Sequence, residues 1–133
     1  MLYKNLSVNE NNILCMNGYN LKELAEKYGT PLYVMDEDRI RENIKNIQTS
    51  VKKYFKNSQI LFASKACDFM AIYKICREER IGVDVVSPGE IYSAYKAGCD
   101  MSEVYFHGNS KSASDMELAI DLGVGCFVVD NED

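Results

Sequence analysis

The chain alternates between short apolar segments and longer segments in which apolar residues recur every three or four positions. A short run of apolar, β-branched and aromatic residues predicts a strand, whereas the longer spacing predicts an amphipathic helix. The short runs are almost continuously apolar, which is typical of strands that are buried on both faces of a sheet. The predicted strands lie in residues 31–36, 59–65, 82–87, 103–109 and 125–131.

Helical spacing fills the intervals between these strands. In the segment that begins near residue 36, Ile40, Ile44 and Ile47 recur on one helical face. One more strand is predicted near residues 12–16, ahead of the repeating pattern. The other predicted helices lie near residues 20–28, 68–80, 91–98 and 114–123.

Capping signals mark the expected helix ends. A helix is expected to begin after Ser87, which is at the cap position. Pro88 would then be the first helical residue and Glu90 the third. Glycines that follow a helical pattern are expected to adopt the left-handed conformation that ends a helix. The cap spacing recurs at Asn20 with Glu23 and at Ser114 with Glu117, and the candidate end glycines are Gly29, Gly82, Gly98 and Gly123.

Alternating strands and helices imply parallel strands that are joined by right-handed crossovers. The alternatives are an open doubly wound sheet and part of a (β/α)8 barrel. A doubly wound nucleotide-binding fold carries a glycine-rich loop after its first strand, and residues 35–39, MDEDR, contain no glycine. We therefore predict an α/β fold, namely a partial (β/α)8 TIM-type barrel of about five parallel strands.

Composition narrows the classes of function. The 133 residues are enough for one modest domain, and the net charge of −5 argues against a nucleic-acid partner. No apolar run approaches the roughly 18 residues that span a bilayer, and the first residues do not resemble a signal peptide, so we expect no membrane partner and a cytoplasmic protein. The five cysteines form no CxxC pair and the lone histidine has no cysteine at ligand spacing, which predicts free thiols and no metal site.

Each predicted strand ends on polar residues. The carboxyl ends of barrel strands meet at one rim, where active sites are built. Most of these residues could equally cap the helices that follow, but Lys65 cannot, since lysine has no acceptor atom and a cation is repelled by a helix N-terminus. The polar residues at the strand ends are Asp36, Lys65, Ser87, His107, Asn109 and Asp130, with Asp84 inside its strand.

Lys65 follows directly on the apolar run of the segment ILFASKACD. A neutral lysine amine adds to a carbonyl group and forms a Schiff base, and burial favours the neutral form. We therefore expect a buried Lys65 at the barrel rim. On this segment alone, a lysine whose ammonium group merely extends to solvent is an equal alternative.

Three motifs in this order carry a family resemblance: FASKA at 62–66, GVDVVSPGE at 82–90 and YFHGNSKS at 105–112. They resemble the diaminopimelate decarboxylases, which belong to the fold-type III group of pyridoxal-phosphate barrel enzymes together with ornithine decarboxylase and alanine racemase. The resemblance extends from about Asn20 onward, and FHGNSKS points to the diaminopimelate enzymes within this group.

The resemblance implies roles for particular residues. Lys65 matches the lysine that forms the internal aldimine with pyridoxal 5'-phosphate, and Asp84 matches an aspartate beside that cofactor. His107 and Asn109 fall at a strand end near the cofactor. Cys67 stands where many relatives have asparagine, which is a departure just beyond the lysine.

The function implied is that of the N-terminal part of a carboxy-lyase which converts meso-diaminopimelate to L-lysine and carbon dioxide in lysine biosynthesis. In the family, a β-domain completes the site of the neighbouring subunit in a homodimer. Residues 1–19 are expected to belong with that domain, and residues 20–133 to the barrel. The family's glycine-rich phosphate loop, its cofactor-stacking histidine and its β-domain have no counterpart here, so this part alone is expected to be inactive and prone to associate.

Three other interpretations stay open from the sequence. The first is a decarboxylase of the same group that acts on another basic amino acid or a polyamine precursor. The second is a barrel protein that binds pyridoxal phosphate without turnover. The third is a purely structural half-barrel in which Lys65 is incidental.

Overall fold

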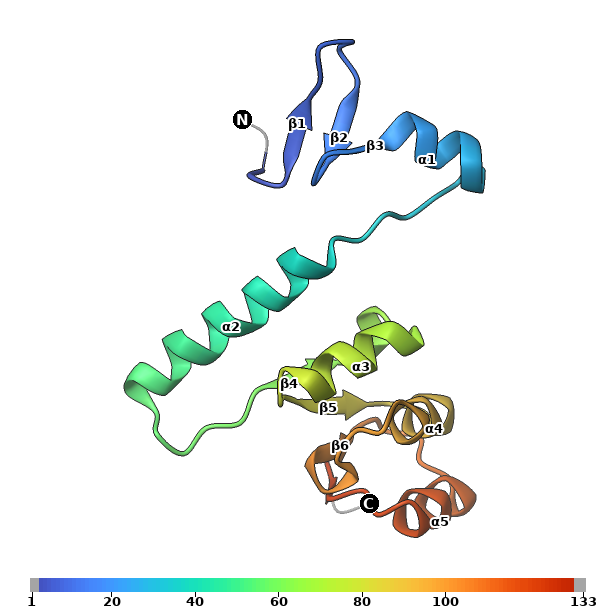
Figure 1. Cartoon of the computed structure of the whole chain (residues 1–133). Helices are drawn as coiled ribbons and strands as arrows, with labels where there is room; N and C mark the ends of the chain where they lie inside the picture. The colour runs from blue at the N-terminus through green and yellow to red at the C-terminus, as the bar shows by residue number, and fades with distance from the viewer. Residues whose placement is uncertain (1–2, 131–133) are drawn as a thin grey trace. The chain divides into compact units, whose positions relative to one another are not determined.

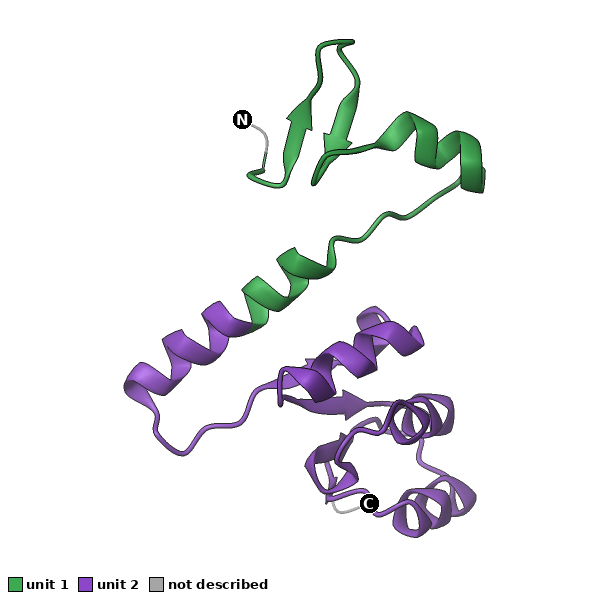
Figure 2. Ribbon diagram, viewed as in Figure 1, with its two compact units in different colours: residues 1–44 green, residues 45–133 purple. Residues whose placement is uncertain are grey.

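The structure is a computed structural model that describes residues 3–130. The chain divides into two compact units, residues 1–44 and residues 45–133 (Figure 2). The long helix α2, Glu37–Tyr54, includes the point of division. It confirms the helix that the isoleucine spacing predicts, and Ile44 is its buried residue.

The first unit contains a small antiparallel sheet. Its strands β1, β2 and β3 pair in chain order, with tight turns in which Asn12, Asn17 and Gly18 have positive φ. The helix α1, Leu21–Tyr28, follows directly, and the Asn20 side chain accepts hydrogen bonds from the backbone of Lys22 and Glu23, as the cap spacing predicts. The strands are β1, Leu6–Val8, β2, Leu14–Met16, and β3, Tyr19–Asn20, of which β2 is the strand that the sequence predicts.

The strand predicted at residues 31–36 is wrong. Residues 32–36 have no regular secondary structure, and Tyr33 is 97% exposed. A strand exists only through hydrogen bonds to a neighbour, and among residues 3–130 none pairs with this segment. Asp36 instead lies at the start of α2, where it accepts a hydrogen bond of 3.2 Å from the backbone N–H of Arg39 and one of 2.7 Å from Asn5 Nδ2.

The second unit contains a parallel sheet with the strand order β4-β5-β6-β7, joined by helices α3, α4 and α5 (Figure 1). Four of the five predicted strands are thus confirmed, and the sheet is the expected part of an α/β barrel. A short 3-10 turn, η2 (Met101–Glu103), leads into β6. The elements are β4, Leu61–Ala63, α3, Met70–Glu78, β5, Gly82–Val85, α4, Pro88–Ala97, β6, Val104–Phe106, α5, Ala113–Asp121, and β7, Cys126–Phe127.

The core of this unit is built on alternate residues of the strands. Val83, Val85, Val104 and Phe106 are almost completely buried, while Asp84, which points to the other face of the sheet, is only half-buried. The expectation that the strands are buried on both faces is therefore wrong for the described residues. The second face stays partly open because the connecting helices pack on the first.

The helix ends agree with the predictions in part. Ser87 caps α4, with its side chain accepting from the backbone of Glu90, and Gly98 ends the helix at a φ of 77°. The predicted cap at Ser114 is wrong, because Ser112 caps α5 in a reciprocal pair with Asp115.

The predicted helix-end role of Gly82 is also wrong. The left-handed residue after α3 is Arg80, with a φ of 55°, whereas Gly82 opens β5. A Cβ atom at Gly82 would lie 2.4 Å from the backbone oxygen of Glu103, so glycine is needed there because the neighbouring backbone approaches closely. Within residues 3–130, the structure has no helix that is long and apolar enough to cross a membrane.

Candidate active site

Lys65 lies in a single 3-10 turn, η1 (Ser64–Ala66), immediately after β4. The backbone N–H of Cys67 closes the turn with a 2.9 Å hydrogen bond to the carbonyl oxygen of Ser64. Ala63, the last residue of β4, pairs with Asp84 of β5. The parallel register therefore places the turn that carries Lys65 beside the carboxyl end of β5, where a barrel active site is expected.

Lys65 itself is exposed, so the expectation that it is buried is wrong. The cause is the open second face of the sheet, which the described residues of this unit leave uncovered at the strand ends. Within the described part of the chain, no hydrogen bond or ion pair holds its amine. The amine is thus available for a ligand at this rim.

The ends of β5, β6 and β7 bring a histidine between two carboxylates. His107 Nδ1 lies 3.7 Å from Asp84 Oδ2, and His107 Nε2 lies 3.6 Å from Asp130 Oδ1. Asp84 is the most buried of the three, with 22% of its side chain exposed. The imidazole can therefore orient the Asp84 carboxylate from one side while it contacts Asp130 on the other.

The loop after β6 is held by backbone contacts and by one lysine. The N–H of His107 donates to Val85 O at 2.8 Å. Lys111 Nζ donates to Val128 O at 2.8 Å and also to Gly108 O, and it lies over the ring of Phe106. Asn109, the fourth predicted site residue, is exposed in this loop, and the structure does not bring it into contact with the other three.

A buried polar cluster lies directly behind Lys65, and the sequence reasoning did not find it. Ser64 is completely buried, and its hydroxyl contacts both the Asp84 carbonyl oxygen, at 2.8 Å, and the Glu90 carboxylate. Burial raises the pKa of Tyr73 to about 12, with Ser64 opposing the shift and the Glu90 charge adding to it. The only sequence signal was the cap position of Glu90, which predicts a helix start but not a buried carboxylate.

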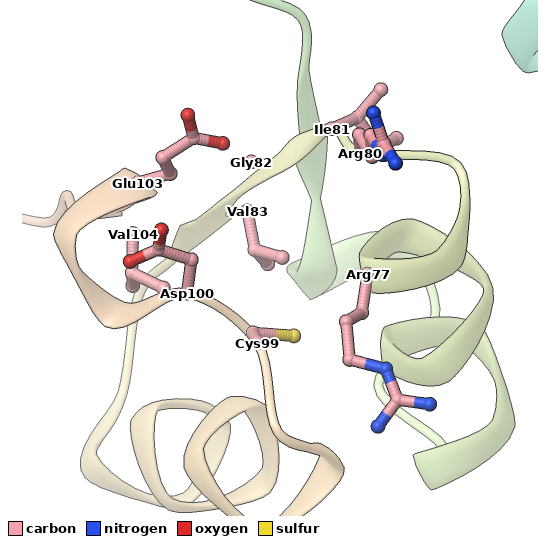
Figure 3. Close-up of a pocket in the computed structure, with 9 residues that line it drawn as sticks. All are labelled: Arg77, Arg80, Ile81, Gly82, Val83, Cys99, Asp100, Glu103 and Val104. Carbon is pink, nitrogen blue, oxygen red and sulfur yellow. The ribbon is translucent and has the colours of Figure 1, made fainter.

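A pocket of this unit lies away from the rim. Figure 3 shows a pocket of about 250 Å³ that is lined by Arg77, Arg80 and Cys99, at the start of β5 and β6. It contains none of the predicted site residues. Parallel α/β folds place their sites at the carboxyl ends of strands, so the rim around Lys65, rather than this pocket, is the candidate active site.

The chemistry of the rim fits the aldehyde end of pyridoxal 5'-phosphate. A primary amine that no described group pairs with is the nucleophile that condensation with an aldehyde requires, and the half-buried Asp84 carboxylate lies on the neighbouring strand. Within residues 3–130, no group of three His, Cys, Asp or Glu side chains could hold a metal ion.

The fold and this rim define an α/β-barrel protein with an exposed lysine at the carboxyl ends of its parallel strands. Residues 38–133 match the family described as pyridoxal-dependent decarboxylase, pyridoxal binding domain. The match covers more than half of the chain, and the chain belongs to this family. The cofactor expected from the motifs, pyridoxal 5'-phosphate, is that of the family.

Within this family, the chain is similar to proteins named diaminopimelate decarboxylase. Diaminopimelate decarboxylase of Halalkalibacterium halodurans is 42% identical over 124 residues, which are 93% of this chain and 28% of that protein. The Bacillus subtilis enzyme of the same name is 41% identical over 123 residues, 92% of this chain and 28% of that protein. The crystal structure of diaminopimelate decarboxylase from M. jannaschii in complex with L-lysine has a TM-score of 0.82 at 30% identity, with 95% of this chain and 30% of that chain covered.

These relatives are much longer than this chain. The chain spans 28% of the two curated relatives and 30% of the solved structure. The part of this chain that matches the pyridoxal-binding family, residues 38–133, includes the turn that carries Lys65.

Proposed function

We propose that this chain is the N-terminal part of a pyridoxal-phosphate-dependent decarboxylase that acts on meso-diaminopimelate and releases L-lysine and carbon dioxide. The observation that carries the proposal is the position of Lys65 in the turn after β4, beside Asp84 of the next strand. The membership of the pyridoxal-binding family and the similarity to enzymes named diaminopimelate decarboxylase support the choice of cofactor and substrate.

The residues of this chain have separate tasks in the proposal. The amine of Lys65 would hold the cofactor at its aldehyde carbon, and it would carry a proton that it can transfer at the substrate α-carbon. The bound cofactor supplies a ring that accepts the electron pair left by the departing carboxylate. Asp84 would present its carboxylate to the cofactor, His107 would orient that carboxylate, and Asn109 would offer a polar contact from the loop after β6.

The surroundings of the site are proposed from the same resemblance. We infer that residues 1–19 belong with a β-rich domain of the longer relatives, which is supported by the antiparallel pairing of β1 and β2, separate from the parallel sheet. A homodimer is proposed as the active assembly, because the rim around Lys65 is open in this chain. A reducing, cytoplasmic location suits the five cysteines, which are free thiols in the structure.

The test is product formation by the longer protein of which this chain is proposed to be the N-terminal part, which is called the intact protein below. With pyridoxal 5'-phosphate and meso-diaminopimelate, we expect release of carbon dioxide and L-lysine in equal amounts. Lys65→Ala should lower kcat by more than about a thousandfold, because the substitution removes both the covalent attachment and the proton donor.

The matched control is Lys74→Ala, an exposed lysine on α3, which should leave the activity unchanged. Activity that survives in Lys65→Ala would overturn the proposed role of this lysine. Release of carbon dioxide from ornithine or arginine, with none from meso-diaminopimelate, would keep the class of reaction and reject the substrate.

A further inference from the structure

Glu90 is an unusual residue for the position it occupies. It is the third residue of α4, yet it is only 7% exposed, and no described lysine, arginine or histidine pairs with its carboxylate. A carboxylate that leaves water must receive hydrogen bonds in compensation. The donors that surround it therefore identify what the residue holds together.

Three donors from two strand ends and one helix start converge on this carboxylate. The backbone N–H of Val86 donates to Oε2 at 3.0 Å, and the Ser87 hydroxyl donates to Oε1 at 3.2 Å. The Ser64 hydroxyl donates to Oε2 as well. One side chain thus joins the turn after β4, the end of β5 and the first turn of α4.

The hydrogen bond between Glu90 and Ser64, in the turn after β4, shows that Glu90 does more than cap α4. A helix cap needs only Ser87, whose side chain already accepts from the Glu90 backbone. The contact with Ser64 adds nothing to that cap, but it fixes the first residue of the turn that presents Lys65. The Ser64 hydroxyl also lies 2.8 Å from the Asp84 carbonyl oxygen, so the same contact aligns this turn with the strand that carries Asp84.

We propose that Glu90, acting through Ser64, is a positioning residue that fixes the η1 turn and thereby the direction in which Lys65 leaves β4. The significance of this for catalysis rests on the proposed function, whereas the positioning itself concerns only the cofactor-free chain. Because Lys65 is exposed and lacks a described partner of its own, the backbone turn is what fixes its origin. A turn that is free to rotate would present the amine in several directions, and reactions lose rate steeply when groups are misplaced by about an ångström.

Hydrogen exchange in the cofactor-free, intact protein tests the positioning directly. In Ser64→Ala and in Glu90→Ala, the amides of residues 65–67 should exchange about tenfold faster, because both variants remove the buried hydrogen bond between Ser64 and Glu90. The effect of the double variant should be smaller than the sum of the two single effects, because both substitutions remove the same contact between Ser64 and Glu90. Glu90→Gln, which keeps an acceptor oxygen for Ser64, should restore most of the protection.

Ser87→Ala is the matched control. It removes a hydroxyl from the same carboxylate but leaves the Ser64 contact, so faster exchange should be confined to the first turn of α4. If Glu90→Ala fails to fold, Ser64→Ala and Glu90→Gln carry the comparison. Unchanged exchange at residues 65–67 in Ser64→Ala would overturn the proposal, and so would faster exchange in Glu90→Ala that is limited to α4.

Steady-state kinetics of the intact protein with bound pyridoxal 5'-phosphate give a second test of the positioning role. Ser64→Ala and Glu90→Ala should lower kcat at least tenfold with KM unchanged, and Glu90→Gln should recover most of the rate. A faster-exchanging turn with an unchanged kcat would overturn the link to catalysis. Loss of activity in Lys65→Ala tests the proposed function separately, since the exchange measurements do not depend on the cofactor.

Discussion

Asp36 illustrates how one carboxylate stabilises the N-terminal unit. Its Oδ2 atom accepts from Asn5 Nδ2 beside β1, and its Oδ1 atom accepts from the backbone N–H of Arg39 at the start of α2. The hydrogen bond from Asn5 is the main reason that the pKa of Asp36 lies below its ordinary value of 3.8. The residue ties the end of the extended segment to the N-terminal sheet.

The lowered pKa gives a prediction with a definite sign. A carboxyl group whose folded pKa is depressed contributes stability above its ordinary pKa, and the contribution is lost as the pH falls through the lower, folded value. The Asn5 side-chain amide signals in an NMR titration should therefore stay constant down to about pH 4 and move below it. Asn5→Ala should raise the pKa of Asp36 toward its ordinary value, whereas Asn11→Ala should not. If the pKa of Asp36 were the same in Asn5→Ala and Asn11→Ala, the hydrogen bond from Asn5 would not be the cause of the lowered pKa.

At the scale of single residues, the sequence predicts well which side chains lie together. It predicts less well whether each side chain is buried. The strand-end rule correctly brings Asp84, His107 and Asp130 together, because parallel strands share one rim. The burial of Lys65 could not be predicted, because it depends on what covers the second face of the sheet. Ser64 and Glu90 were missed as a pair because their contact joins residues that are 26 positions apart.

At the scale of elements, the start of α5 shows why the cap predicted at Ser114 is wrong. Ser112 and Ser114 each have an acidic residue three positions later, and only Ser112 forms the reciprocal pair, with Asp115. Local spacing could not choose between them. The choice depends on where the loop after β6, held by Lys111, delivers the chain to the helix.

The two serines can be compared by the same substitution. Ser112→Ala should lower the free energy of unfolding by about 1 kcal/mol, because the amides of the first turn lose their acceptor. Ser114→Ala, inside the helix, should be neutral or slightly stabilising. Urea denaturation of the intact protein measures both, and a larger loss for Ser114→Ala would contradict the observed cap.

Close backbone approaches also belong to this scale. A Cβ atom at Gly125 would lie 1.9 Å from the backbone oxygen of Ser102, where η2 passes β7. At Gly89 in α4, the nearest atom to an added Cβ would be 3.9 Å away. These two glycines could not be distinguished from the sequence, because the contact at Gly125 arises only when the elements are packed.

Gly125→Ala should therefore destabilise the protein by about 1–3 kcal/mol through overpacking against backbone. Gly89→Ala should stabilise it by about 0.4–1 kcal/mol, because alanine fits the helix and restricts the unfolded chain. Thermal unfolding followed by circular dichroism distinguishes the two signs. Similar effects for both substitutions would show that Gly125 has no special contact.

At the scale of the whole molecule, the parallel sheet is open in two respects. Its outer strands β4 and β7 have no partner on their outer sides within the described residues, and its second face is only partly covered. The alternation of strands and helices predicted the class of fold and four of the five strands. It could not predict how far the sheet is covered, because the pattern of one chain does not report what packs on it.

Unpaired strands and an open face predict association of the 133-residue chain on its own. Sedimentation velocity should show species larger than the monomer, with a share that grows with protein concentration. The reason is that edge-to-edge pairing supplies the missing backbone hydrogen bonds. A monomer that unfolds cooperatively and stays monomeric as its concentration is raised would contradict this expectation.

The most direct measurement of the central claim is chemical trapping at Lys65. The intact protein is mixed with pyridoxal 5'-phosphate and reduced with borohydride, and the modified lysines are located by peptide mass spectrometry. We predict that Lys65 carries the stable adduct in nearly stoichiometric amount, and that the exposed Lys74 carries almost none. Equal modification of the two lysines, or an unmodified Lys65, would contradict the assignment of Lys65 as the cofactor-binding residue.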